Sequence, residues 1–314
     1  MGLQKKKIVV PHIDRQRTVS VKLMGNISEI SISDRLNRGA TIRPISGEAF
    51  IVLSTGEVKE FAAHADNRAE NRRNLEKTMR NLSGLINTNV TPENIECCRF
   101  ITLTYRENQR DPQQLYSDFK RFNQRFKRYV KKLDLQYEYI FVLEAQARGA
   151  LHAHCIYIFN SAPPFFDSSI ITEIWGQGFV SIKSLTGNPD DIGKYLCSYL
   201  SDFPDDENPP LEAVGGSIKE VNVNGKQKRI IKGGRLKLIS AGTRIYRCSR
   251  GIKKPVIIQT PYAEALEHLA DMGFEKVYES ALELRDPESD FKSTCVKQVF
   301  KRYTNPTYNR KEHH

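Results

Sequence analysis

Residues 136–159 read QYEYIFVLEAQARGALHAHCIYIF, and this stretch decides the fold of the sequence around it. Residues 136–144 and 150–159 are rich in aromatic and β-branched side chains, which predicts two strands. The Gln-Ala-Arg-Gly sequence between them is short enough for a hairpin turn. We therefore expect an antiparallel pair of strands in the middle of a sheet.

The segments on either side extend this pattern. Residues 99–105 (RFITLTY) alternate in polarity and predict a further strand. A helix is expected over residues 111–133, because Asp111 is a good N-cap and Pro112 suits a first helical position. Residues 168–175 and 188–201 predict two more helices, with a short strand between them. Strand, helix, strand, strand, helix, strand is the ferredoxin-like or RRM-like plan, an α+β fold whose central antiparallel β-sheet carries helices on one face.

Composition predicts how the rest of the chain is organised. We expect a β-rich N-terminal extension over residues 1–65, with a hairpin around residues 54–56, and a central domain over residues 66–201. Residues 202–212 are acidic and rich in proline, which is typical of a linker. The basic C-terminal region over residues 213–314 is then a second extension.

Charge and cysteine content narrow the class of protein. Lys and Arg number 48 against 37 Asp and Glu, which gives a net charge of +11 and favours a polyanionic partner, nucleic acid first and an anionic membrane surface second. No apolar run approaches the roughly 20 residues that a membrane helix needs. The six cysteines include adjacent Cys97 and Cys98 but no CxxC pair, so we expect reduced thiols and a cytoplasmic protein. No P-loop sequence is present, so an unwinding motor must come from elsewhere.

His152 and His154 stand two apart in a predicted strand, so their side chains point to the same face, about 7 Å apart at the backbone. Glu144 lies across the predicted hairpin on the neighbouring strand. Two imidazoles and a carboxylate suit a divalent ion such as Mg²⁺ or Mn²⁺. The alternative is that the two histidines are a packed pair on a buried strand face.

The helix predicted after residue 188 carries a second group of polar residues. Asp191, Tyr195 and Tyr199 recur every four residues and form one stripe. A tyrosine hydroxyl needs help to act as a nucleophile, and a bound metal and the neighbouring Lys194 could provide it. Asp191 could accept a proton or activate a water. The alternative is an ordinary amphipathic helix in which the tyrosines are core residues.

Basic residues gather in two segments and could contact the phosphates of a nucleic acid. The alternative is that each run only forms a solvent-exposed face of its element. Arg148, in the hairpin turn, is expected beside the scissile phosphate. The remaining candidates for DNA contact are Lys120, Arg121, Arg125, Lys127 and Arg128 in the first segment and Lys226, Lys228, Arg229, Lys232, Arg235 and Lys237 in the second.

Three motifs, in this order, resemble those of HUH endonucleases. They are FITLTY at residues 100–105, EAQARGALHAH at residues 144–154 and DIGKYLCSY at residues 191–199. More narrowly, they are similar to the motifs of rolling-circle replication initiators, the Rep proteins of bacterial plasmids, phages and integrative elements. The resemblance covers about residues 99–201, and it implies that the central domain is an HUH nuclease core with N- and C-terminal extensions.

The resemblance implies a metal-dependent DNA nicking-joining enzyme that acts on single-stranded or hairpin DNA at a replication origin. His152 and His154 would hold Mg²⁺ or Mn²⁺, with Glu144 as an auxiliary ligand. Tyr195, in a Gly-Lys-Tyr sequence, would attack the scissile phosphate and keep the 5′ end as a phosphotyrosine. The free 3′-OH would prime a host DNA polymerase, while a host helicase unwinds the duplex.

The sequence departs from the family's pattern at the second catalytic residue. Either Asp191 or Tyr199 could serve the terminating step. In addition, Ser198 stands at the position where many relatives have a lysine, and Lys194 could take over the role of that lysine. A conjugative relaxase or an HUH transposase would use the same chemistry. A non-catalytic DNA-binding regulator could keep the fold without nicking.

Overall fold

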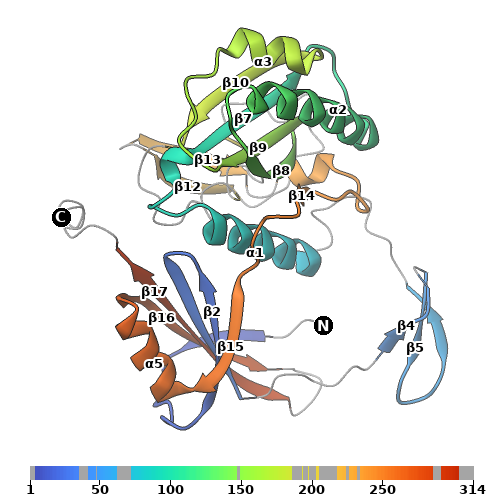
Figure 1. Ribbon diagram of the computed structural model, residues 1–314. Coiled ribbons are helices and arrows are strands. Elements are labelled where there is room, and N and C mark those ends of the chain that lie inside the picture. The colour runs from blue at the N-terminus through green and yellow to red at the C-terminus, as the bar shows by residue number, and fades with distance from the viewer. Residues whose placement is uncertain are drawn as a thin grey trace. The chain divides into compact units, whose positions relative to one another are not determined.

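The computed structural model divides the chain into two compact units (Figure 1). One unit combines both ends of the chain, Met1–His64 and Pro255–His314, and the other is Ala65–Lys254. The second unit contains every candidate site residue. The structure describes residues 4–34, 42–46, 48–61, 72–146, 149–185, 193, 197, 203–204, 218–223, 226–231, 234–285 and 291–303.

The main sheet of the second unit has the predicted strand order. Within the described residues, its strands pair in the order β10-β7-β9-β8-β14, and every pair is antiparallel. The segment β7-α2-β8-β9-α3-β10 therefore follows the ferredoxin-like plan, and the expected α+β fold is confirmed. The elements are α1 (Arg72–Asn89), η1 (Ile95–Cys97), β7 (Cys98–Tyr105), α2 (Pro112–Lys131), β8 (Tyr137–Ala145), β9 (Leu151–Phe159), α3 (Ser168–Trp175), β10 (Gly178–Ser184), η4 (Gly234–Leu238) and β14 (Tyr246–Cys248).

Helices α2 and α3 pack on one face of this sheet. α2 starts where the sequence predicts, because the Asp111 side chain accepts a hydrogen bond from the Gln113 N–H at 2.9 Å. The Trp175 indole of α3 donates to the Thr104 carbonyl of β7 at 3.0 Å. The apolar stripe that holds α2 against the sheet consists of Leu115, Phe119, Phe122, Phe126 and Val130.

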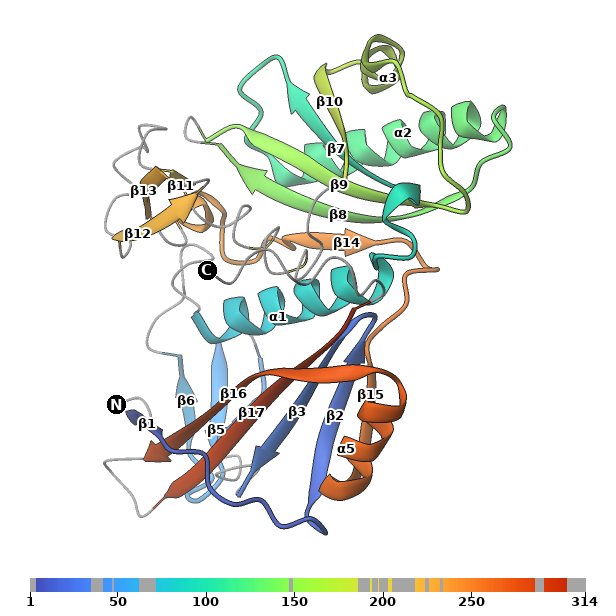
Figure 2. The same cartoon turned by 90° about the vertical axis from the view of Figure 1, so that its left-hand side faces the viewer.

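The opposite face of the sheet carries the candidate metal ligands. Phe141 in β8 and Tyr157 in β9 contact the α2 rings, so the residues that alternate with them point the other way. Glu144, His152 and His154 are on this second face. Figures 1 and 2 both show α1 on that side, across the sheet from α2 and α3.

The second unit extends beyond the predicted linker at residues 202–212. β14 pairs with β8 as an additional strand, and just before it the Ile245 carbonyl accepts a hydrogen bond from the Leu143 N–H at 2.8 Å. Leu236 and Ile239 are each 2% exposed. Both side chains therefore belong to the core of the domain. A small sheet in the same unit pairs β11 (Phe203–Pro204), β13 (Lys226–Ile231) and β12 (Ile218–Val223) in that order.

The first unit joins strands of the predicted N-terminal extension to strands from residues 255–314 in one sheet. In the described part of the chain, its strands pair in the order β1-β16-β17-β3-β2-β15, so β3 near the N-terminus lies beside β17 near the C-terminus. Helix α5 contributes Ala265 and Leu269 to the core of this unit. The elements are β1 (Gln4–Ile8), β2 (Thr18–Met24), β3 (Ile27–Ser33), β15 (Val256–Pro261), α5 (Tyr262–Asp271), β16 (Phe274–Arg285) and β17 (Lys292–Arg302).

A separate sheet in this unit contains the hairpin expected around residues 54–56. β5 (Ala49–Val52) pairs with β6 (Val58–Glu60), and β4 (Ile42–Pro44) pairs with the other edge of β5. Gly56 between β5 and β6 has a φ of 74°, a backbone angle that glycine adopts without strain. No helix in the described residues combines the length and the apolar composition needed to span a membrane.

Candidate metal centre

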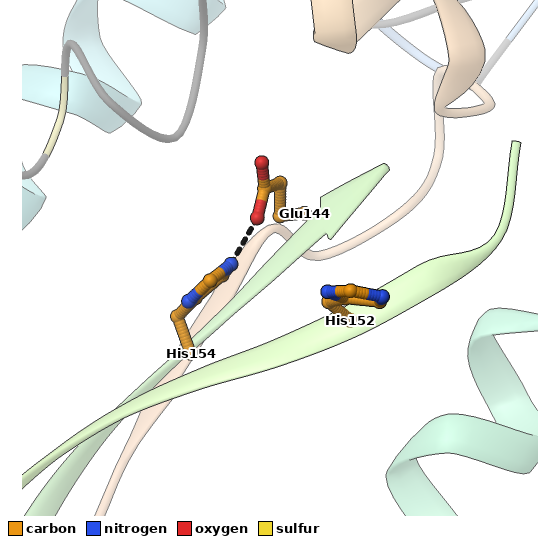
Figure 3. A group of neighbouring side chains, drawn as sticks. All are labelled: Glu144, His152 and His154. Atoms are coloured by element: carbon orange, nitrogen blue, oxygen red, sulfur yellow. Dashed lines mark hydrogen bonds and ion pairs between the residues drawn. The ribbon is translucent and has the colours of Figure 1, made fainter. Parts of the chain in front are cut away.

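The two histidines and the glutamate come together as the sequence predicts. Glu144 in β8 is directly opposite His152 in β9, and His154 is two residues further along the same strand. The three possible ligand atoms lie within 4.8 Å of one another. His154 Nε2 and Glu144 Oε2 form a hydrogen bond, which Figure 3 shows as a dashed line, with the His152 ring beside them.

This cluster is buried. Glu144 and His154 are each 3% exposed and His152 is 6% exposed. A carboxylate removed from water needs charged or hydrogen-bonding partners. Burial acts to raise the pKa of Glu144, but the hydrogen bond from His154 and the nearby charges of His154 and Arg235 outweigh it, so the pKa is lowered. The carboxylate is therefore kept in the ionised form that a metal ligand requires.

The strand β7 orients His154. Thr102 lies opposite His154 in the β7–β9 register, and its hydroxyl is 3.1 Å from His154 Nδ1. The Phe100 ring stacks on the imidazole, with the centroids 5.4 Å apart and the planes at 19°. If Nε2 gives up its proton to bind a metal, Nδ1 donates to the hydroxyl and the lone pair on Nε2 would be directed to the cluster. Thr102 and Phe100 belong to the FITLTY motif, and the alternation of that strand was the signal that could have placed them on this face.

Arg235 reaches the cluster from η4. Its Nη1 is 2.6 Å from Glu144 Oε1 and donates to the Ala145 carbonyl at 3.3 Å. Only 4% of Arg235 is exposed. Its basic neighbours in the sequence placed this residue among the expected DNA contacts. Its burial against Glu144 favours a role in the cluster instead, since a guanidinium in this position is not available to a surface phosphate.

The donor set fits a divalent cation. Two imidazole nitrogens and one carboxylate oxygen converge from two adjacent strands, and imidazole and carboxylate are common ligands of divalent metals. The hydroxyl at His154 Nδ1 and the guanidinium at Glu144 Oε1 are the kind of outer partners that metal ligands usually have. The cluster could therefore hold a metal ion, and its composition does not select between Mg²⁺ and Mn²⁺.

The predicted catalytic residues of the helical motif lie outside the described part of the chain. These are Asp191, Lys194, Tyr195 and Tyr199, and Arg148 of the hairpin turn lies outside it as well.

Two helical residues of the same segment are described, and both contact α1. The Gly193 N–H donates to Asn87 Oδ1 at 2.9 Å, and the Cys197 thiol donates to the Met79 carbonyl at 3.6 Å. A Cβ at Gly193 would lie 2.5 Å from the Ser83 carbonyl, so glycine permits this approach.

The basic residues of α2 are exposed but lie on the α2 side of the sheet, away from the cluster. Arg121 pairs with the buried Asp118, and the Arg125 guanidinium donates to the Ile174 and Trp175 carbonyls at the end of α3. These two arginines therefore have structural partners. Lys120, Lys127 and Arg128 are also exposed.

The second basic segment is described in part. Lys226, Lys228 and Arg229 belong to β13, where Arg229 is opposite Glu220 of β12. Lys237 lies in η4 and is half-buried, and Lys232 is outside the described residues. The sequence grouped these residues with Arg235. The structure distinguishes Arg235 from them, because Arg235 is buried against Glu144.

Fold and site together define a class: an α+β domain in which a His-x-His strand of an antiparallel sheet and a facing carboxylate form a possible metal centre. Residues 98–204 match the family model described as Replication-associated protein ORF2/G2P. The match begins at the first residue of β7, ends at the last residue of β11 and includes the whole cluster. It confirms the resemblance to rolling-circle replication initiators. A comparison with curated proteins gives no match.

Proposed function

We propose that this chain is a site-specific single-strand DNA endonuclease and strand transferase that initiates rolling-circle replication. The observation that carries the proposal is the buried Glu144–His152–His154 cluster inside the region that matches the replication-associated family. A divalent ion bound there, Mg²⁺ or Mn²⁺, supplies Lewis acidity toward the scissile phosphate. The three side chains hold the ion, and Thr102 and Arg235 hold two of them in place.

Tyr195 is the nucleophile in this proposal. Its phenol oxygen forms a bond to phosphorus while the bond from phosphorus to the 3′ oxygen breaks. The phenol proton passes to a base, and the 3′ oxygen takes up a proton to become the free 3′-OH that primes synthesis. The products are a 5′-phosphotyrosine and a 3′ end, so the energy of the phosphodiester bond is kept for rejoining.

The sequence around Tyr195 supports this choice. Gly193 and Cys197 are four residues apart and both contact α1, so they share a face of the helix that the sequence predicts here. Tyr195 is halfway between them in the sequence, in the Gly-Lys-Tyr match to the family's nucleophile. Asp191 or Tyr199 serves the terminating step in the proposal, and Lys194 and Arg148 contact the scissile phosphate.

The partners follow from the chemistry. The net charge of +11 favours DNA, and the exposed basic residues of α2, together with the basic residues of β13, contact its phosphates in this proposal. A host helicase separates the strands and a host polymerase extends the 3′ end, in the cytoplasm.

A nicking assay tests the proposal. Wild-type protein, His152→Ala and the control His12→Ala, which changes an exposed histidine of the other unit, are incubated with supercoiled plasmid that carries the origin and Mn²⁺. We expect nicked circles from the wild type and from His12→Ala, and a loss of several orders of magnitude with His152→Ala. A DNA-binding regulator would give no nicking in any sample. Replication that starts at the mapped nick separates an initiator from a relaxase or a transposase.

A further inference from the structure

Arg235 is a buried cation that contacts the cluster and comes from a part of the chain beyond the segment that matches the family. It follows β9 by more than 70 positions in the sequence, yet its Nη1 is 2.6 Å from Glu144 Oε1. The neighbouring Leu236 and Ile239 are each 2% exposed, which anchors η4 in the core of the domain. The packing of η4 therefore fixes the approach of Arg235 to Glu144.

The two oxygens of Glu144 have different partners. Oε1 pairs with Arg235, whereas Oε2 bonds to His154 Nε2. A carboxylate can turn about its terminal torsion, which is soft. A guanidinium that holds one oxygen therefore decides where the other oxygen points. Here Oε2 points into the space that His152 and His154 share.

We propose that Arg235 is a positioning residue of the cation site: it holds Glu144 Oε1 so that Oε2 is presented in a fixed direction to a divalent cation. This inference rests on the proposed function in one respect, namely that a divalent cation binds at the cluster. It also assigns the segment after the acidic, proline-rich stretch to the active domain, because η4 delivers a residue to the centre.

Two effects of Arg235 oppose each other. Its positive charge repels a nearby cation, whereas its ion pair with Glu144 Oε1 keeps a buried carboxylate oriented. The second effect dominates in this geometry, because Glu144 is 3% exposed and bulk solvent cannot take the place of the guanidinium. Loss of such an outer partner typically lowers metal affinity by about 10- to 100-fold.

Mn²⁺ binding to the full-length chain tests the proposal, with free Mn²⁺ followed by electron paramagnetic resonance. Arg235→Met should bind Mn²⁺ about 10- to 100-fold more weakly than the wild type. Arg235→Lys restores the charge without the planar fork and should fall between the two. Arg247→Met is the matched control, because Arg247 lies in β14 and stacks on Tyr116 of α2, on the other face of the sheet. It should keep wild-type affinity.

The outcomes separate this proposal from the proposed function. Wild-type affinity in Arg235→Met, or tighter binding, would overturn the positioning role while the metal centre stands. A wild-type chain that binds no Mn²⁺ would overturn both. If Arg235→Met does not fold, as judged by circular dichroism, Arg235→Lys decides: a loss of about three-fold or more supports the proposal, and wild-type affinity overturns it.

Discussion

His154 is held at both of its ring nitrogens, and this determines what the ring can do. Thr102 contacts Nδ1 and Glu144 contacts Nε2, while Phe100 packs on the face of the ring. An imidazole fixed in this way has one nitrogen directed to the cluster and one tautomer favoured when a metal binds. The orientation comes from the β7 register and not from the His-Ala-His sequence alone.

Replacing Thr102 with valine tests this orientation. Thr102→Val removes the hydroxyl at nearly constant volume, and we expect Mn²⁺ affinity to fall by roughly ten-fold or more. Thr102→Ser keeps the hydroxyl and should stay within about three-fold of the wild type. Calorimetric titration with Mn²⁺ measures both, and equal affinities for the serine and valine variants would contradict the role given to Thr102.

The two histidines give a second prediction at this scale. His154→Ala should lower nicking by orders of magnitude and leave oligonucleotide affinity within a few-fold, because Lys and Arg contacts to phosphates supply most of the affinity. Chelation with EDTA should have the same effect on the wild type, and added Mn²⁺ should restore the wild type but not the variant. Melting temperature, measured on the same samples, tests the alternative of a packed histidine pair: that alternative predicts that EDTA changes nothing.

The sequence predicted the cluster but not its supporting residues. His152, His154 and Glu144 could be placed together because strand alternation and a short hairpin fix their geometry locally. Arg235 could not be placed, because its approach depends on how a segment about 90 residues away packs against β8. Nothing in its own surroundings distinguishes it from the basic residues around it.

The basic elements differ in their position relative to the cluster. α2 lies on the sheet face opposite the cluster, so in the proposed function its lysines and arginines would contact DNA only at a distance from the cluster. Lys226 and Lys228 belong to β13, the middle strand of the small sheet β11-β13-β12.

Neutralising β13 tests whether it contacts phosphates. Changing Lys226, Lys228 and Arg229 to glutamine should lower DNA affinity and reduce the slope of log affinity against log salt by about 0.7 to 0.9 for each phosphate that is no longer neutralised. The control changes an equal number of lysines in the other unit that pair with glutamates, Lys276, Lys292 and Lys297. If both sets of changes alter the slope equally, only net charge matters and β13 has no specific role in DNA binding.

Elements with a strong local pattern were predicted, and those without one were missed. The order from β7 to β10 follows from alternation, helical spacing and the Asp111-Pro112 cap. β14 has three residues and pairs with a strand about 100 positions earlier, so its pattern is too short to recognise. It nevertheless covers the edge of β8, where an unpaired strand would be prone to association.

At the scale of the whole molecule, the chain ends form one unit and the middle forms the other. The sequence suggested separate extensions over residues 1–65 and 213–314. Pairings such as β3 with β17 join residues more than 260 positions apart, and no local signal specifies such a partner. The proline-rich segment that looked like a boundary falls inside the second unit instead.

Fragments of the chain test this division. A fragment of residues 65–254 keeps η4 and β14, whereas residues 65–212 lack them. The shorter fragment leaves Glu144 without its buried cation, which costs about 3–5 kcal/mol, and exposes the β8 edge. We expect a cooperative thermal transition and Mn²⁺ binding from the longer fragment and neither from the shorter one. Equal melting temperatures would show that residues 213–254 are not part of the domain.

Covalent capture of a labelled oligonucleotide by the full-length chain tests the central claim most directly. A single-stranded origin oligonucleotide with a labelled 3′ end is incubated with Mn²⁺ and separated under denaturing conditions. The account predicts that the label moves with the wild-type protein and with Tyr199→Phe, and that it does not with Tyr195→Phe, His152→Ala or wild type in EDTA. Adduct formed by Tyr195→Phe at the wild-type rate would reject Tyr195 as the nucleophile. No adduct from any sample, with DNA binding intact, would contradict the endonuclease.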